Sequence, residues 1–380
     1  MWGDMNIKQL LMVLWGGIVL AGCGRPSSSA GDSFTWHIDP SAARKMDLAQ
    51  IVDSIFLVPL ETGDSCLVKK ICAVEYADGK YYVNNDFTDI QVYDSLGHFL
   101  YSTRKCKGIG PNDYRTVLGF TRLPHDTLEL FDAMAKKMHC YVHSEGLVKS
   151  TSLPSDVLPA GEYAWLNGDT CVFAEGSPDN PVLKFYSRSR GTLFKVVEDR
   201  QKSTFMLTSH CLYRFDGMLY YTPAYPSNGL YVLDENLNKK KVLHLDFGKH
   251  NFSMDDLPAD MNLKQVTEYW DAHPELVYPL TKCVLDSLYL VFFQFEGSLC
   301  VAAQDRSTGT TVVLRNEAGS KPQLMMPDYA GGGKLCCAVA PEYLPYAVDT
   351  ALMSPSDVAR LERVKADDNP VLVVYRLKHF

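Results

Sequence analysis

A polar loop over residues 104–115 carries the side chains best suited to hold a ligand. It opens with the basic run Arg104-Lys105-Cys106-Lys107 and continues as Gly108-Ile109-Gly110-Pro111. A Gly-x-Gly segment binds phosphate when it follows a strand and opens a helix. Here strand-like residues follow Pro111, so the spacing favours a loop that joins two sheets over a phosphate site.

We expect this loop to border the main binding pocket, because loops that join the units of a repeat protein are where such proteins usually bind. The five predicted binding residues carry both charge signs, an amide and an aromatic ring: Lys107, Asn112, Asp113, Tyr114 and Arg115. A structural role is the alternative. The glycines then serve turn geometry, Asp113 accepts backbone N–H bonds, and Tyr114 packs between sheets.

No residue pattern indicates catalysis or a resident metal ion. His139 and His143 lie on one face of a predicted strand, but two ligands are too few for a closed zinc site. Neither His-Glu-x-x-His nor Gly-x-Ser-x-Gly occurs. Asp86, Asp113 and Asp132 could gather at a central channel, although spacing alone does not bring them together. We therefore predict no cofactor, with Ca²⁺ at such acids as the alternative.

The segment Leu20-Ala21-Gly22-Cys23 indicates a lipid attachment site. It closes an apolar run from Ile7, as in a secretory signal whose removal leaves an N-terminal cysteine. The run is too short to span the roughly 30 Å core of a bilayer. We expect residues 1–22 to be removed, Cys23 to carry the lipid (palmitate), and residues 23–50 to form a flexible tether. An ordinary signal peptide with a chance cysteine is the alternative.

Composition narrows the class of protein. The chain has 380 residues and a formal net charge of −8. An acidic chain without a basic block is a poor nucleic-acid binder. Its length exceeds the roughly 250–300 residues at which one compact core stops growing, which favours two domains or one repeat architecture. We expect the cysteines other than Cys23 to be structural free thiols, with disulfides as the alternative in an exported protein.

A repeat of about 45 residues runs through the chain. Each unit is a strand that ends in an aromatic residue, a polar turn and a return strand. The first four copies are marked by Tyr93, Tyr141, Tyr186 and Tyr231, at spacings of 48, 45 and 45 residues. Two later copies fit around Val301 and Val373. Six such copies predict an all-β, six-bladed β-propeller over residues 51–380. A pair of open β-sandwiches with accidental spacing is the alternative.

Two helical insertions and a closing strand complete the predicted ring. The insertions are expected near 253–276 and 354–366, and they delay the fifth and sixth copies. The second has Ser354 as a candidate N-cap, with proline in its first turn. Residues 54–60 form a strand before the first repeat. We expect this strand to pair with the last blade, beside Val371–Arg376, and to close the ring.

Four segments of the chain carry a family resemblance: Val58–Thr62, Val92–Phe99, Gly108–Tyr114 and Asp368–Tyr375. Together they resemble the six-bladed β-propeller lipoproteins of Bacteroides and related gut bacteria, a group akin to NHL-type propellers. The third segment departs from that family's Gly-x-Gly-Pro-x-Glu-Tyr loop by having Asp113 in place of glutamate. The resemblance implies the propeller fold and an envelope location, and it implies little chemistry.

The resemblance also bears on orientation. Surface-displayed lipoproteins of that group tend to carry acidic residues just after the lipidated cysteine. In this chain the first acid after Cys23 is Asp32. The resemblance therefore implies an outer-membrane anchor that faces the periplasm rather than the cell surface.

These observations predict a monomeric envelope protein, held to the membrane by the lipid on Cys23. It would bind a glycan, a peptide or a partner protein without catalysing a reaction. One alternative is a propeller hydrolase or lyase that uses channel carboxylates, with or without Ca²⁺. Another is a structural subunit of an envelope complex that docks through the 253–276 insertion.

Overall fold

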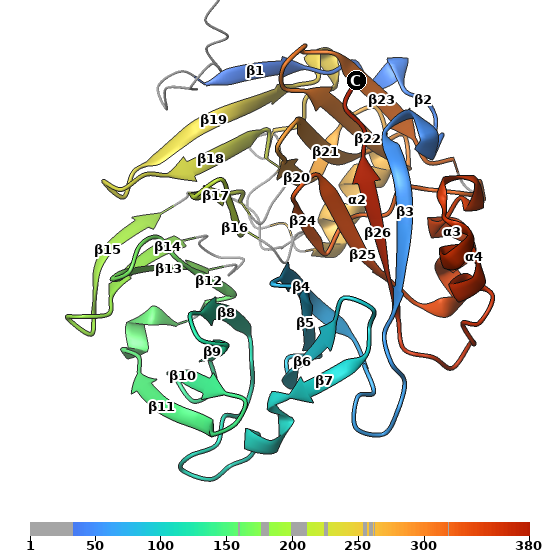
Figure 1. Ribbon diagram of the computed structural model, residues 1–380. Helices are drawn as coiled ribbons and strands as arrows, with labels where there is room; N and C mark the ends of the chain where they lie inside the picture. Colours follow the sequence, from blue (N-terminus) through green and yellow to red (C-terminus); the bar gives the residue numbers. More distant parts are fainter. Residues whose placement is uncertain are drawn as a thin grey trace, which may run out of the picture. The chain divides into compact units, whose positions relative to one another are not determined.

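Each copy of the sequence repeat folds into one antiparallel sheet. The computed structural model describes residues 33–158, 160–175, 182–198, 211–223, 227–253, 257, 261, 263–317 and 319–380. The predicted signal segment, Cys23 and the first part of the predicted tether lie outside the described residues. Within residues 33–380 six sheets follow one another and stand as blades around an axis (Figure 1). The predicted six-bladed β-propeller is confirmed.

The first three blades each consist of four consecutive strands. Blade 1 contains β4 (Ile71–Ala77), β5 (Lys80–Asn85), β6 (Asp89–Asp94) and β7 (Phe99–Ser102). Blade 2 contains β8 (Gly119–Leu123), β9 (Thr127–Asp132), β10 (Lys137–Val142) and β11 (Gly146–Ser152). Blade 3 contains β12 (Glu162–Trp165), β13 (Thr170–Glu175), β14 (Val182–Ser187) and β15 (Thr192–Glu198).

The last three blades each include one strand from the start of the chain. Blade 4 contains β16 (Leu212–Phe215), β17 (Met218–Tyr221), β18 (Gly229–Leu233), β19 (Lys239–Asp246) and β1 (Phe34–His37). Blade 5 contains β20 (Tyr278–Val284), β21 (Leu288–Phe295), β22 (Ser298–Asp305), β23 (Thr311–Arg315) and β2 (Arg44–Lys45). Blade 6 contains β24 (Tyr329–Gly331), β25 (Lys334–Val339), β26 (Val371–Leu377) and β3 (Val52–Pro59).

The helices are short and lie between strands. The α-helices described are α2 (Leu263–Ala272), α3 (Leu344–Ala347) and α4 (Pro355–Leu361). The 3₁₀ helices are η1 (Pro40–Ala42), η2 (Leu48–Gln50), η3 (Thr103–Cys106), η4 (Ser155–Val157), η5 (Gly248–His250), η7 (Pro341–Tyr343) and η8 (Thr350–Leu352). In the described part of the chain, none of the helices has the length and apolar character that crossing a bilayer requires. Helices α2 and α4 fall within the two insertions expected from the sequence.

The repeat recognised in the sequence marks the third strand of every blade. Its six copies fall in β6, β10, β14, β18, β22 and β26. Tyr93 and Tyr141 on these strands are fully buried. A third strand is hydrogen-bonded on both sides, and neighbouring blades cover both of its faces. It therefore takes large apolar side chains at fixed positions, which makes it the most visible part of the period.

The folded body begins earlier than we predicted from the sequence. Residues 23–50 were expected to form a flexible tether, but β1 pairs in parallel with β19, and β2 pairs in parallel with β23. Trp36 and Leu48 are almost completely buried. Removing these side chains from water stabilises the segment against the body by roughly 1.5–3 kcal/mol for each large apolar group. Residues 33–50 are therefore part of the propeller.

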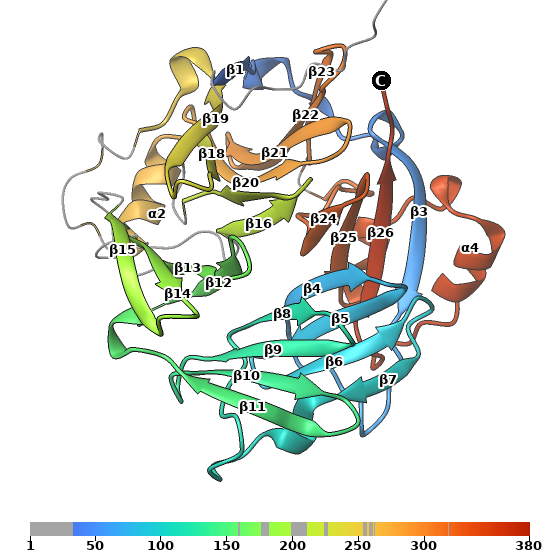
Figure 2. The ribbon, with the colours of Figure 1, turned by 60° about the vertical axis from the view of Figure 1, so that its left-hand side comes forward.

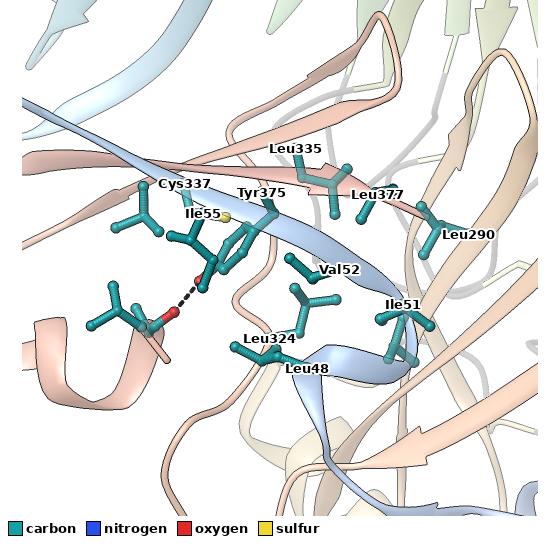
Figure 3. Packing of buried hydrophobic residues seen from close by; sticks show 14 of the residues in the cluster. Leu48, Ile51, Val52, Ile55, Leu290, Leu324, Leu335, Cys337, Tyr375 and Leu377 are labelled. Atoms are coloured by element: carbon teal, nitrogen blue, oxygen red, sulfur yellow. Dashed lines mark hydrogen bonds between the residues drawn. The ribbon is translucent and has the colours of Figure 1, made fainter. Parts of the chain in front are cut away.

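Strand β3 closes the ring, as predicted. It pairs antiparallel with β26 over almost its whole length, from Val371 opposite Pro59 to Leu377 opposite Val52. Its inward side chains enter the largest apolar cluster of blades 5 and 6 (Figure 3). In that cluster Ile55 lies beside Tyr375, whose hydroxyl donates to the Ala347 carbonyl at 2.7 Å. The chain is thus joined to itself across more than 300 residues.

Helix α4 covers the outer edge of the closing strand (Figure 2). Ser354 caps the helix by accepting from the Asp357 N–H, and Pro355 occupies the first turn, as the sequence predicted. The buried Asp357 carboxylate in turn accepts from the Leu57 N–H of β3 at 3.2 Å. An exposed strand edge invites pairing with other chains. The insertion therefore satisfies part of this edge and shields it.

Asn369 fastens the ring at the start of β26. Its side-chain N–H groups donate to the carbonyls of Glu61 and Cys66, and its amide oxygen accepts from the Val68 N–H at 2.9 Å. Its backbone N–H donates to Thr62 Oγ1 at 2.8 Å. One buried amide thus organises the chain that leads from β3 to blade 1.

We expect Asn369→Ala to lower the free energy of unfolding by about 2–4 kcal/mol, because buried backbone groups would lose their partners. Urea unfolding followed by circular dichroism measures this difference. The matched control is Asp367→Ala, at an exposed position two residues away, which should change stability by less than about 0.5 kcal/mol. Equal stability of the two variants would contradict the role given to Asn369.

Candidate functional site

Tyr114 anchors the 104–115 loop between blades 1 and 2. Its side chain is fully buried, and its hydroxyl lies 2.9 Å from Thr103 Oγ1. Burial raises the pKa of Tyr114 above its ordinary value. The Tyr114 N–H donates to the Cys106 carbonyl, and the Gly108 N–H donates to the Tyr114 carbonyl, each at 3.0 Å. The two ends of the loop are therefore tied together.

Asp113 shapes the tip of the same loop. Its carboxylate accepts from the Gly110 N–H at 2.8 Å. A Cβ atom on Gly108 would lie 2.2 Å from the same carboxylate oxygen, so a larger residue here would push the carboxylate away from the Gly110 N–H. Asp113 and Tyr114 thus hold the loop from within, which is the structural alternative that the sequence left open for these two residues.

The remaining predicted residues face solvent. Lys107, Asn112 and Arg115 are exposed, and within the described residues no ion pair involves the Lys107 or Arg115 side chain. At the tip between them, Ile109 is 92% exposed. We did not single out Ile109 from the sequence, although its position between two glycines of the loop was visible. The loop thus presents an apolar side chain among cations.

A hollow of about 590 Å³ opens between blades 1 and 2 at the other end of strand β8. It is lined by Asp78, Lys80, Tyr82, Arg122, Leu123, Pro124, His125, Asp126, Thr127 and Leu128. None of the five predicted binding residues lines this hollow. The loop enters β8 at its start, whereas the hollow lies at its end, which separates the two by the length of the strand. The binding role of the loop stays a prediction.

Two tight hairpin turns frame this hollow. Asp78 and Gly79 join β4 to β5 with φ angles of 50° and 74°, the left-handed conformation that two-residue hairpins require. His125 and Asp126 join β8 to β9 with φ angles of 63° and 53°. The Asp-Gly turn was visible in the sequence as a hairpin. Its proximity to the second turn depends on how the blades pack.

The charges in the hollow are paired with one another. The Arg122 guanidinium donates to Glu75 at 2.9 Å and to Asp78 at 2.5 Å. It also lies 5.4 Å from the centre of the Tyr82 ring. These carboxylates outweigh burial and raise the pKa of Arg122. Lys80 lies 3.3 Å from Asp126. Two cations and two carboxylates line the hollow, and Glu75, outside the lining, is a further carboxylate bound to Arg122.

The Asp132 carboxylate, considered from the sequence, is used in hydrogen bonds within blade 2 and its leading loop. Asp132 is fully buried and accepts from the Arg115 N–H, the Thr116 hydroxyl and the Ala135 N–H. Burial alone would raise its pKa, but these bonds and nearby His139 lower it to about 2. Among the described residues, no three or more His, Cys, Asp or Glu side chains are placed to hold a metal ion.

The two histidines take separate structural roles. His139 is buried with Nδ1 2.7 Å from Ser150 Oγ. The ring of His143 instead stacks on Tyr101 at a centroid distance of 4.1 Å. The cysteines of the described residues, Cys66, Cys72, Cys106, Cys140, Cys171, Cys211, Cys283, Cys300, Cys336 and Cys337, are all free thiols, as expected. Burial raises the pKa of most of them, so they are held as neutral thiols.

Lys282 is a buried amine that the sequence analysis missed. It lies on β20 with 4% of its surface exposed, and Nζ donates to Thr222 Oγ1 at 3.2 Å. No carboxylate within the described part of the chain pairs with it. Burial lowers its pKa to about 7, while neighbouring Cys211 acts in the opposite direction. A lone lysine in an apolar run, Leu280-Thr281-Lys282-Cys283-Val284, is the signal that could have found it.

Comparison with known proteins finds one matching family profile and several structures of similar fold. The profile of a domain of unknown function, DUF4934, matches residues 34–376. No curated protein matches the chain. The structure is similar to that of a putative exported protein from Bacteroides fragilis, at 13% identity and a TM-score of 0.69, over 91% of this chain and all of that one. It is also similar to a member of the DUF4221 family from Bacteroides vulgatus, at 11% identity and a TM-score of 0.51, over 86% and 99% of the two chains. At these identities the likeness concerns the fold alone.

Lys282 makes stability depend on pH. Its pKa is about 7 when folded and roughly 10.4 when unfolded. Above pH 7 the unfolded chain therefore binds more protons at this site, so the free energy of unfolding should rise with pH by up to about 1.4 kcal/mol per unit until both states are neutral. Lys282→Met should lack this rise. Urea unfolding of both proteins at pH 7 and pH 9 measures the difference, with exposed Lys365→Met as control. Parallel pH profiles for wild type and Lys282→Met would contradict the assignment.

Proposed function

We propose that this chain, which belongs to the DUF4934 family, is a lipid-anchored envelope protein that docks a partner protein through its 104–115 loop and catalyses no reaction itself. The observation that carries this proposal is the exposure of Ile109 at the tip of a loop that is tied by its own hydrogen bonds. An isoleucine that is 92% exposed gains free energy when a partner covers it. A loop that is already ordered loses little conformational entropy on binding.

The construction of the loop supports contact rather than catalysis. Asp113 and Tyr114 are used inside the loop, which leaves Lys107, Asn112 and Arg115 to meet a partner. The two cations have no partner of their own within the described residues. Lys107 and Arg115 are positive charges on a chain whose net charge is −8. A partner with an apolar pocket for Ile109 and acidic residues around that pocket would complement them, because complementary charge fixes orientation and speeds association.

Strand β1, where the described chain begins, and strand β7, which leads into the 104–115 loop, lie on opposite sides of the ring in both views (Figures 1 and 2). The lipid is proposed at Cys23, which lies outside the described residues. We propose an outer-membrane anchor that faces the periplasm, as the family resemblance implies.

We expect Ile109→Asp to abolish the cross-linked complex that a short amine-reactive reagent forms with the protein in intact cells, and Arg115→Glu, which removes no reactive amine, to weaken it. Both positions are exposed, so the melting temperature should stay within a few degrees. Leu96→Asp is the control, because Leu96 is 54% exposed in the turn between β6 and β7, away from the loop. A complex that persists in Ile109→Asp and disappears in Leu96→Asp would reject the loop as the docking site.

The anchor is tested by a single substitution. Cys23→Ala removes the thiol that would receive the lipid, and we expect it to abolish metabolic labelling with palmitate and to release the protein from the membrane fraction. Cys66→Ala serves as the matched control, because Cys66 is a buried free thiol of the folded body. Labelling that persists in Cys23→Ala would rule out lipid attachment at this residue.

A further inference from the structure

We propose that the hollow between blades 1 and 2 is a second binding site, and that its ligand is a neutral saccharide of one or two sugar rings. This site is separate from the docking loop, since none of the exposed loop residues lines it. Its volume of about 590 Å³ falls within the range of roughly 300–1,000 Å³ that small-ligand pockets occupy.

The balance of charge points to a neutral ligand. Lys80 and Arg122 line the hollow together with Asp78 and Asp126, and each cation is already paired with a carboxylate. A charged ligand would have to break one of these pairs and leave its partner uncompensated. A ligand without charge can be bound with both pairs intact.

The same side chains keep hydrogen-bonding capacity for hydroxyl groups. An ammonium has three N–H donors, and the bonds of Lys80 go to the Asp126 carboxylate alone. A carboxylate has about four lone-pair positions, so Asp126 can accept further bonds. Neighbouring hydroxyls of a sugar ring, spaced to reach a donor and an acceptor at once, match this arrangement. Hydrogen bonds to charged groups contribute about 1.5–3 kcal/mol each.

The rest of the lining is apolar enough to meet the C–H face of a sugar. Leu123, Pro124 and His125 are part of the lining, and Pro124 and His125 are exposed. The Tyr82 ring is also part of the lining; it is buried, and the Arg122 guanidinium lies over it. Three ion pairs between blades 1 and 2 hold these groups in place before a ligand arrives. Arg122 of blade 2 bonds to Glu75 and Asp78 of blade 1, and Asp126 of blade 2 pairs with Lys80 of blade 1.

The test is an array of neutral and acidic oligosaccharides, followed by calorimetric titration with the neutral glycans that bind. We expect binding of at least one neutral mono- or disaccharide. Asp126→Asn, which keeps the shape and tolerates the left-handed backbone, and Lys80→Met should each weaken it by about tenfold or more. Circular dichroism confirms that each variant is folded.

Asp216→Asn is the matched control, because Asp216 occupies the equivalent hairpin turn of blade 4 with a φ angle of 47° and does not line the hollow. It should bind as wild type does. Ile109→Asp should also bind normally, which keeps this result independent of the docking loop. Absence of any neutral glycan from the array, exclusive binding of acidic glycans, or unchanged affinity in folded Asp126→Asn and Lys80→Met would each overturn the proposal.

Discussion

The ladder between β3 and β26 is the constraint on which the rest of the propeller depends. Five blades could form from local hairpins, but blade 6 is complete only when residues 52–59 meet residues 371–377. The same meeting places Val58 and Leu60 beside Val74 and Tyr81 of blade 1, so the boundary between the last and the first blade is built from the closing strand. Contacts between residues so far apart in sequence carry a large loop-closure cost. The buried amide of Asn369 and the cover by α4 reinforce the ladder where that cost is greatest.

Arginine side chains near the hairpin turns connect neighbouring blades. Arg122 of blade 2 reaches Glu75 and Asp78 of blade 1. Arg188, in the turn after β14, pairs with the buried Glu129 of blade 2 and stacks on Trp165 at 3.9 Å. Arg214 of blade 4 donates to backbone carbonyls of blade 3. In each case a guanidinium extends back to the preceding blade. Apolar packing between sheets is not directional, whereas these bonds fix how far one blade turns against the next.

The parts of the fold that were predictable share one physical cause. The third strands of the blades bury tyrosines at a fixed spacing. The β-rich segment over residues 54–60 precedes the first repeat, so the last blade was the remaining partner for it. Strand β1 was missed because four residues, Phe34-Thr35-Trp36-His37, are too few to show a period and follow a stretch of small polar residues. The hollow was missed because Arg122 and Glu75 are 47 residues apart, and only the packing of blades brings them together. The loop was recognised, but its spacing left open whether Asp113 and Tyr114 meet a ligand or hold the loop from within.

The route of the chain from β1 to β3 has a mechanical consequence. The described chain enters along blade 4, where β1 pairs with β19 through four residue pairs, then touches blade 5 through β2, and only then becomes the closing strand. A pull on Ser33 therefore loads the short ladder of β1 first and that of β2 next. Strands β1 and β2 can detach and extend the N-terminal segment while β3 stays paired with β26. Strands β1 and β2 would thus detach under force before the β3–β26 pairing that closes the ring.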